Sequence, residues 1–413
     1  MQIFAASYLL PVSSPPITGG AMVVENGRIT AVGPLSEVRS SWPGPVREFP
    51  GGVIMPGLVN AHTHLELTHF PAWKVRKGLH YLPRTYADWI MQVIKIRRGL
   101  TAAELTNSVR EGIAKCLETG TTTVGEILSD RSLVPLYTSS SLGGRIFFEA
   151  LGLEPARCAR LATDLDEAIK AFPPGRLLPG ISPHAPHTVV GPFFSRLAAM
   201  GKELGVPLMT HLAESPEEVR FFHDTTGALA DQIYPFAGWE DYLPAPRHTT
   251  PTAFLDSLGA LDANMTAVHA VQVTPSDAEI LARRGVAVVL CPRSNERLAV
   301  GTAPAALLKK VGIPLALGTD SLASNDSLSL WDEMRFLLDR HPAVFSPAEV
   351  LSIATIGGAH ALRLAHEIGS IEVGKRADFL VVAVPPAVTA ESLCASIIGR
   401  SQLEHVFCAG EES

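Results

Sequence analysis

Short runs rich in Val, Ile and Leu recur along the chain from about residue 53, and longer segments with helical patterning lie between most of them. This alternation is typical of strands and helices that build a parallel sheet. Eight runs have the length and the flanking turn residues of strands: 53–62, 121–127, 145–151, 177–185, 207–213, 265–271, 286–292 and 314–320. Eight strand–helix units over about 315 residues predict a (β/α)₈ barrel with insertions.

An open, doubly wound sheet is the alternative architecture for such a pattern. It normally carries a glycine-rich phosphate-binding turn after its first strand. The sequence has no G-x-G-x-x-G at that place and no P-loop. The barrel is therefore the better interpretation.

The two ends of the chain have a different pattern from the middle. The first residues alternate short β-prone runs with turn residues, and Asn26-Gly27 lies between two apolar runs, as in a hairpin. After the last helical segment the β pattern returns. We expect the end of the chain to fold back beside the opening β unit.

Composition and charge exclude several classes of protein. Of the 413 residues, 46% are apolar and 18% are charged, which excludes a disordered chain. The net charge is −7 and there is no basic block, so nucleic acid is not an expected partner. No apolar run approaches the ~18 residues of a membrane helix. A signal peptide begins with a positively charged region, and this chain has no Lys or Arg before Arg28.

The five cysteines are scattered and contain no C-x-x-C pair, so neither a disulfide framework nor a cysteine zinc site is expected. Together these features predict a soluble protein of a reducing compartment, in the cytoplasm.

Polar side chains with metal-binding chemistry stand at the ends of the predicted strands. His62 and His64 form an H-x-H in which both side chains point to one face of the strand. His211, His269 and Asp320 end the fifth, sixth and eighth strands, so all five should meet at the catalytic end of a barrel. Such a set suits Zn²⁺ or Fe²⁺, and spacing alone leaves open whether His269 is also a ligand.

Glu214 follows His211 by three residues and would lie next to the metal. There it is a candidate for general acid and base catalysis. The alternative is a solvated carboxylate at the start of a helix, where a negative charge is favourable.

Seven short motifs are spread along the chain: PGLVNAHTHLE at 56–66, SPHAPHT at 182–188, THLAE at 210–214, VHAV at 268–271, CPRSN at 291–295, LGTDS at 317–321 and VGKRADF at 373–379. Together they resemble the amidohydrolase superfamily, in its branch of mononuclear aminohydrolases. That branch contains adenosine-type, cytosine and S-adenosylhomocysteine deaminases and triazine hydrolases. The resemblance extends from about residue 20 to 385.

The resemblance implies an α/β fold with a distorted, TIM-like (β/α)₈ barrel over residues 53–367. It also implies a small β-sandwich assembled from residues 1–52 and 368–413. This agrees with the β pattern at both ends of the chain.

The resemblance also implies how the polar residues are used. The metal would be held by His62, His64, His211 and Asp320. Glu214 and His269 would be catalytic, with His269 hydrogen-bonded to the attacking water rather than ligating the metal. Binuclear members carry a carboxylated Lys on strand four, and the run 177–185 contains no Lys, so one divalent ion, Zn or Fe, is expected.

The implied reaction is hydrolytic deamination of a small molecule. A divalent cation lowers the pKa of water and so makes hydroxide available at neutral pH. Asp320 would accept the released proton, and Glu214 would give a proton to the ring nitrogen beside the attacked carbon and then to ammonia.

Residues for substrate binding are expected on the loops around the barrel end: His184, Glu66, Arg84, Trp89, Arg293 and Asn295. For Trp89 and Arg84 a packing helix is the alternative, and for Arg293 and Asn295 a role in ordering their loop. Within the branch, the motifs are most similar to 6-amino-6-deoxyfutalosine deaminases of menaquinone biosynthesis. The alternatives are deamination of S-adenosylhomocysteine, methylthioadenosine or adenosine, hydrolysis of an aminotriazine, and a scaffold without activity. The sequence is also compatible with a homo-oligomer.

Overall fold

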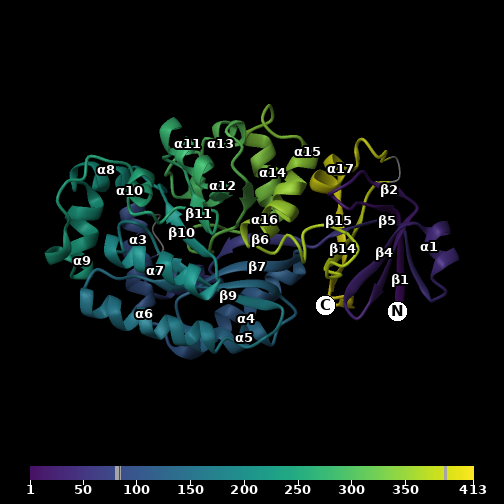
Figure 1. Ribbon diagram of the computed structural model, residues 1–413, viewed down its shortest axis with the longest axis horizontal. Coiled ribbons are helices and arrows are strands. Elements are labelled where there is room, and N and C mark those ends of the chain that lie inside the picture. The colour runs from purple at the N-terminus through teal and green to yellow at the C-terminus, as the bar shows by residue number, and fades with distance from the viewer. Residues whose placement is uncertain (80–82, 84, 386–387) are drawn as a thin grey trace.

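The computed structural model describes residues 1–79, 83, 85–385 and 388–413. Within these residues the chain forms a barrel and a separate sheet, which we call the terminal sheet because both ends of the chain build it. The two parts lie beside each other, with the purple and yellow ends of the chain together in the terminal sheet (Figure 1).

Eight parallel strands form the barrel, in the order in which they follow along the chain. They are β6 (Leu58–Thr63), β7 (Thr121–Leu128), β8 (Gly143–Ala150), β9 (Leu177–Pro183), β10 (Leu208–Leu212), β11 (Met265–His269), β12 (Ala287–Leu290) and β13 (Leu315–Leu317). A parallel bridge between Thr63 and Asp320 connects the last strand to the first. The predicted (β/α)₈ barrel is confirmed.

The first predicted barrel strand, 53–62, is divided in the structure, so the prediction of a single strand was wrong. Its first residues belong to β5 (Val46–Pro56) of the terminal sheet, and β6 begins at Leu58. Gly57 between them packs so closely on β7 that a Cβ atom would come within 2.1 Å of Thr122 Oγ1. The junction could not be predicted from the sequence because the end of β5 and the start of β6 are both buried and form one apolar run.

Helices lie between the barrel strands and cover the outside of the barrel (Figure 1). They are α2 (Phe70–Arg76), α3 (Tyr86–Arg97), α4 (Ala102–Glu118), α5 (Val134–Thr138), α6 (Pro155–Lys170), α7 (Gly191–Leu204), α8 (Pro216–Asp224), α9 (Tyr234–Ala237), α10 (Pro251–Ser257), α11 (Pro275–Arg284), α12 (Pro292–Arg297), α13 (Ala305–Lys310), α14 (Leu330–Arg340) and α15 (Pro347–Ser352). The longest, α4, begins at a capping box in which Thr101 and Glu104 satisfy each other's backbone N–H groups.

The short helix α16 (Gly358–Ala361) covers the N-terminal ends of the barrel strands. Thr266, near the start of β11, donates a hydrogen bond to the carbonyl of Ala361 at 2.9 Å, and Arg145 of β8 donates to that of Leu362 at 2.6 Å. Apolar side chains from inside the barrel pack against this helix. This end of the barrel is therefore closed, and the opposite end remains for a site.

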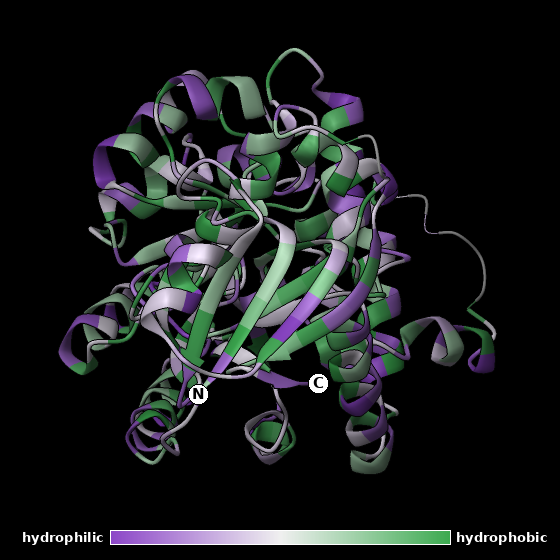
Figure 2. Cartoon of the chain, turned by 90° about the vertical axis from the view of Figure 1, so that its right-hand side faces the viewer, coloured by the Kyte–Doolittle hydropathy of each residue, from purple (hydrophilic) through white to green (hydrophobic). Residues whose placement is uncertain are grey.

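The terminal sheet contains strands from both ends of the chain, as predicted. They are β1 (Gln2–Leu9), β2 (Ile17–Thr18), β3 (Gly20–Glu25), β4 (Arg28–Pro34), β5, β14 (Phe379–Ala383), β15 (Gln402–Cys408) and β16 (Glu411–Glu412), with α1 (Leu35–Ser41) and α17 (Leu393–Arg400) nearby. The rings of Phe4, Phe379 and Phe407 pack together although β1 and β14 are not neighbours, so the sheet curves around them. Figure 2 looks onto this sheet.

The predicted hairpin at the start of the chain is present. β3 and β4 are antiparallel neighbours, and Asn26 and Gly27 between them both have positive φ, at 50° and 74°. This is the conformation that a two-residue hairpin turn requires.

Among the residues that the structure describes, no helix has the length and apolar character needed to cross a membrane.

Candidate active site

Three histidines meet at the C-terminal end of the barrel. His62 lies in β6, His64 directly follows that strand, and His211 lies in β10. One ring nitrogen from each lies within 4.8 Å of those of the other two. The two-residue spacing of the H-x-H and the convergence of strand ends bring them together, as the sequence predicts.

These imidazoles have the chemistry of metal ligands. Burial lowers the pKa of His62, His64 and His211, so all three are neutral at pH 7, the form that binds a metal. Neither ring nitrogen of His62 has a hydrogen-bond partner among the described residues. His211 donates from Nδ1 to the carbonyl of His184 at 2.8 Å, which leaves the Nε2 lone pair free for a metal. The residues present therefore fit a divalent cation.

Asp320 completes this arrangement. Its Oδ1 is 3.7 Å from Nε2 of both His62 and His64. Its Oδ2 accepts hydrogen bonds from the hydroxyls of Ser294 and Ser324, each at 2.7 Å. One carboxylate oxygen is thus fixed, and the other faces the imidazoles.

Two residues of the site have backbone conformations that are costly for residues other than glycine. The φ angle is 57° at Asp320 and 71° at His269. Such conformations cost of order 1–3 kcal/mol and gather at functional sites, where surrounding contacts hold them. His269 is the last residue of β11 and Asp320 follows the end of β13 by three residues, so the change in chain direction at these strand ends turns their side chains into the site.

His269 and Glu214 lie side by side next to the histidine cluster. Nε2 of His269 is 3.7 Å from Oε1 of Glu214. Nδ1 of His269 donates to Oδ1 of Asn295 at 2.9 Å, because an amide oxygen can only accept. In the neutral ring, Nε2 of His269 therefore carries the lone pair that can receive a proton.

The environment of Glu214 favours its protonated form. Burial raises the pKa of Glu214, and the negative charges of Asp320 and Glu218 raise it further, although His269 and Tyr86 act in the opposite direction. The hydroxyl of Tyr86 donates to Oε2 at 2.9 Å, and Glu218 accepts the backbone N–H of Glu214 at 2.9 Å. A raised pKa suits a carboxyl group that must both give and take protons near pH 7.

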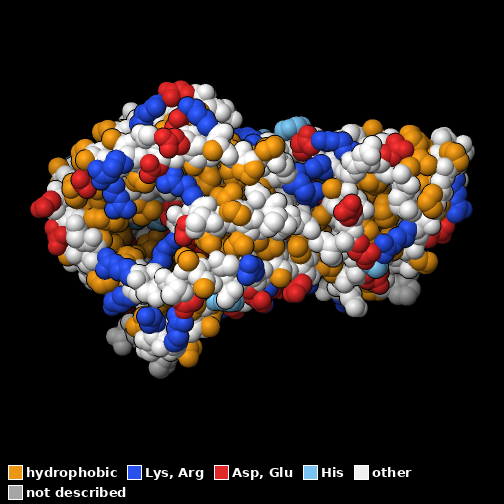
Figure 3. Space-filling view, turned by 90° about the horizontal axis from the view of Figure 1, so that it is seen from below, with side chains coloured by type: hydrophobic (Ala, Val, Ile, Leu, Met, Phe, Trp, Pro, Cys, Tyr) orange, Lys and Arg blue, Asp and Glu red, His pale blue; other side chains and the backbone are white. Residues whose placement is uncertain are grey.

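A cavity of about 450 Å³ opens above these residues. His184, Trp89 and Tyr86 line it, together with Leu229, Ile233 and Trp239 from the segment after β10. Its volume is within the usual range of small-molecule sites. On the face seen in Figure 3 the barrel half of the molecule is hollowed, with Lys and Arg side chains around the hollow.

His184 is placed as the sequence predicts, at the cavity. Burial and the neighbouring imidazole of His187 lower the pKa of His184 to about 3, so its ring is neutral. Nδ1 is hydrogen-bonded to the hydroxyl of Thr188 at 2.8 Å. Nε2 is the nitrogen left for a ligand.

Trp89 also lines the cavity, and its indole N–H donates to the carbonyl of Ala323 at 2.8 Å. The indole is thereby fixed as an aromatic wall. Arg84, the other residue predicted from this insertion, lies outside the described residues.

Three predicted substrate contacts have partners within the protein. Arg293 forms ion pairs with Asp326 and Glu333 and does not line the described cavity. Asn295 is buried behind His269, where it orients that ring, and this agrees with the alternative of an ordering role.

Glu66 is the third. It is buried, and its Oε1 accepts hydrogen bonds from Arg97 at 2.5 Å and Ser129 at 2.7 Å. It acts on the cavity through Arg97 and Ser129, which do line it.

Sequence reasoning missed several cavity residues that come from helices, and Tyr86 and Arg157 are the two that the proposals below use. Tyr86 begins α3, and Arg157 is in the first turn of α6. Neither belongs to a motif, and only the packing of these helices over the barrel end brings them to the site. The only hint in the sequence was that Tyr86 lies three residues before Trp89, which was predicted to contact substrate.

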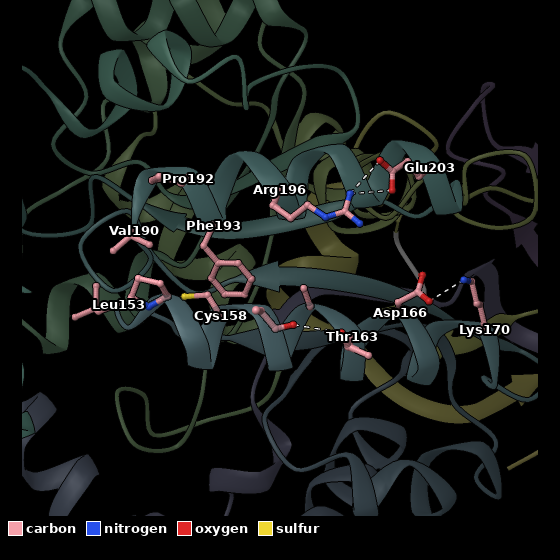
Figure 4. A pocket seen from close by; sticks show the side chains of 13 residues that line it. Leu153, Cys158, Thr163, Asp166, Lys170, Val190, Pro192, Phe193, Arg196 and Glu203 are labelled. Carbon is pink, nitrogen blue, oxygen red and sulfur yellow. Dashed lines mark hydrogen bonds and ion pairs between the residues drawn. The ribbon is translucent and has the colours of Figure 1, made fainter.

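A larger hollow, of about 1040 Å³, lies between α6 and α7 (Figure 4). Its floor is apolar, with Cys158 and Phe193. Its charged side chains pair with each other, Arg196 with Glu203 and Lys170 with Asp166. It offers no group for acid, base or metal chemistry comparable with the histidine site.

The barrel and its histidine-rich centre have the arrangement that a metal-dependent hydrolase requires. A sequence model of the amidohydrolase family matches residues 53–412, so the chain belongs to the amidohydrolase family. A model of the imidazolonepropionase-like composite domain of bacteria matches residues 20–44, within the terminal sheet.

Curated relatives of this chain are deaminases. An aminodeoxyfutalosine deaminase of Deinococcus radiodurans is 34% identical over 353 residues, which are 82% of this chain and 80% of that protein. A 5-methylthioadenosine/S-adenosylhomocysteine deaminase of Nitratidesulfovibrio vulgaris is 32% identical over 382 residues, 89% of this chain and 79% of that protein. With the family, these relatives make the chain a hydrolase that acts on carbon–nitrogen bonds.

Solved structures with this fold include an adenosine deaminase of Xanthomonas campestris with bound zinc. It is 28% identical with a TM-score of 0.80, and the match covers 100% of this chain and 92% of that one. An aminofutalosine deaminase of Helicobacter pylori in complex with methylthio-coformycin has a TM-score of 0.88 at 22% identity, covering 100% of both chains. At that identity the second likeness supports the fold alone.

Proposed function

We propose that this protein is a metal-dependent nucleoside deaminase that hydrolyses the amino group of an adenine-type base. The observation that carries the proposal is the convergence of Glu214, His269 and Asp320 on three neutral histidines at the floor of the cavity. His62, His64, His211 and Asp320 would hold one divalent ion. The ion supplies the Lewis acidity that makes water nucleophilic at neutral pH.

The protein's own groups then move the protons. Asp320 accepts the proton released by the attacking water, and Nε2 of His269 orients that water. Protonated Glu214 gives its proton to the ring nitrogen beside the attacked carbon. The resulting Glu214 carboxylate then takes the proton of the hydroxyl group now on the attacked carbon and gives it to the departing amino group, which leaves as ammonia as the carbon–nitrogen bond breaks and the carbonyl forms. The proton held by Asp320 returns Glu214 to its protonated form.

His184 and Trp89 fit the binding of the base. The neutral His184 ring can hydrogen-bond the base without a charge penalty, and the fixed indole of Trp89 offers an aromatic wall. The apolar Leu229 and Ile233 exclude water from the same cavity.

Removing the Tyr86 hydroxyl is expected to change the pH dependence of turnover. The Tyr86 hydrogen bond lowers the pKa of Glu214, so Tyr86→Phe should raise that pKa further. Because Glu214 acts first in its protonated form, the loss of kcat at high pH should move upward by up to about one pH unit, or about 1.4 kcal/mol. The pH profile of kcat for ammonia release measures this shift.

Tyr8→Phe is the control, because Tyr8 donates to the carbonyl of Val388 in the terminal part of the chain. Its profile should match that of the wild type. An unchanged profile for Tyr86→Phe would mean that Tyr86 does not tune Glu214.

For the particular substrate we propose 6-amino-6-deoxyfutalosine, an adenine nucleoside with a benzoate-bearing tail. The relative of 34% identity supports this choice. The carboxylate of the benzoate tail needs a cationic partner, and the cavity offers Arg157. This residue lines the cavity and has no ion pair or hydrogen bond with the described residues. A buried carboxylate without such a partner is strongly penalised. The relative of 32% identity keeps S-adenosylhomocysteine, which also bears a carboxylate, as the alternative.

Arg157→Ala is expected to lower kcat/KM for carboxylate-bearing nucleosides by about tenfold to a hundredfold, the loss of one charge-assisted contact of roughly 1.5–3 kcal/mol. Adenosine has no carboxylate and should be turned over as by the wild type. Comparison of kcat/KM for the two kinds of substrate separates a binding contact from damage to the fold.

Arg160→Ala is the matched control, because Arg160 lies in the same helix but lines another hollow. It should leave both substrates unaffected. An equal loss for tailed and untailed nucleosides in Arg157→Ala would contradict the assignment of Arg157.

A further inference from the structure

A second cluster of metal-ligating side chains lies on the surface, away from the barrel centre. It consists of His223 and Asp224 at the end of α8 and His248 shortly before α10, and all three are exposed. One ligand atom from each residue lies within 4.8 Å of the other two. His223 Nδ1 and Asp224 Oδ1 are 2.7 Å apart, and the two imidazole rings are 5.3 Å apart between centroids.

The protein holds this cluster together without an ion. The backbone N–H of His248 donates to the carbonyl of His223 at 3.1 Å. The guanidinium of Arg247 lies over the rings of Phe222 and Phe254, 4.9 and 4.7 Å from their centroids. His248 itself has a φ of 50°, a costly conformation that these contacts sustain. The two histidines are therefore fixed as neighbours although they are 25 positions apart in the sequence.

The cluster stands at both ends of one segment. Residues 225–247 leave α8 at His223 and Asp224 and return at His248, and α8 and α10 lie side by side (Figure 1). This segment contributes Leu229, Ile233 and Trp239 to the wall of the active-site cavity. A group that connects the two ends of this segment would therefore restrict the motion of the cavity wall.

We propose that His223, Asp224 and His248 form a second binding site, for a borderline divalent cation such as Zn²⁺, which ties the two ends of the cavity-wall segment together. Two imidazoles and a carboxylate are a ligand set that Zn²⁺ prefers. Ligands of tetrahedral Zn²⁺ at 2.0–2.2 Å are about 3.4 Å apart, so exposed side chains within 4.8 Å need only small rotations. In the bound state the ion replaces the proton between His223 and Asp224, and water fills the fourth position.

Calorimetric titration of the holoenzyme with Zn²⁺ tests this site. The wild type should take up one further ion beyond that of the active site. His248→Ala should lose this binding or weaken it by at least about tenfold, while His366→Ala, which removes an exposed histidine elsewhere, should bind like the wild type. Equal further uptake by the wild type and His248→Ala, or none by the wild type, would overturn the proposal.

Hydrogen exchange tests whether the ion connects the two ends of the cavity-wall segment, residues 225–247. In the wild type, Zn²⁺ should slow exchange of backbone amides within residues 225–247, and in His248→Ala it should not. If Zn²⁺ binds at the cluster and exchange in this segment does not slow, the ion does not restrain the segment and that part of the proposal is wrong. Neither measurement uses substrate, so both outcomes are independent of the proposed deaminase activity.

Discussion

Glu214→Gln is expected to fold and bind metal like the wild type but to release ammonia about 10²–10⁴-fold more slowly, the usual contribution of a general acid and base. The amide keeps the size of the side chain and can still meet the Tyr86 hydroxyl, which donates to Oε2 at 2.9 Å. It cannot take a proton from one place and give it to another. Single-turnover and steady-state kcat, with the metal content of the same sample, measure the effect.

Glu217→Gln is the control, since Glu217 lies in the next helix, α8, and is not among the described residues that line the cavity. It should retain wild-type kcat. A Glu214→Gln enzyme within about threefold of wild type would mean that another group moves the protons, and that Glu214 serves only the structure around α8.

Removal of the active-site ion is expected to have the other large effect. Chelation, or His211→Ala, should lower turnover by at least about 10³-fold, because without a cation the pKa of water returns from about 7 toward 15.7. Adding Zn²⁺ or Fe²⁺ back should restore the chelated wild type but not the variant. His405→Ala is the control, because its imidazole pairs with Glu412 in the terminal sheet.

Elemental analysis and anomalous scattering give the number of ions in the active site. The account predicts one, held by His62, His64, His211 and Asp320, since strand β9 has no Lys to bridge two ions. Two well-occupied ions about 3.5–4 Å apart in the barrel centre would contradict it.

Much of the barrel could be predicted because parallel strands are buried on both faces and read as apolar runs. The limits of β7, β10 and β11 agree with the sequence to within a few residues. The junction at Gly57 could not be read, because one apolar run serves two sheets there.

The centre of the site was predictable for a related reason. His62, His64, His211, His269 and Asp320 are tied to strand ends, and strand ends converge in a barrel. Tyr86 and Arg157 reach the cavity from helices whose position depends on tertiary packing, so no local pattern marked them. The charge of Arg293 is used within the protein, by Asp326 and Glu333, which agrees with the alternative that this residue orders its loop.

The central claim is that this chain deaminates an adenine-type nucleoside with a carboxylate-bearing tail. Side-by-side kcat/KM values for ammonia release from 6-amino-6-deoxyfutalosine, S-adenosylhomocysteine, methylthioadenosine, adenosine, cytosine and an aminotriazine test it most directly. The account predicts the highest value for 6-amino-6-deoxyfutalosine, about tenfold to a thousandfold above adenosine, from one charge-assisted contact together with apolar burial of the tail. Equal values for all adenine nucleosides, or a preference for cytosine or the triazine, would contradict it.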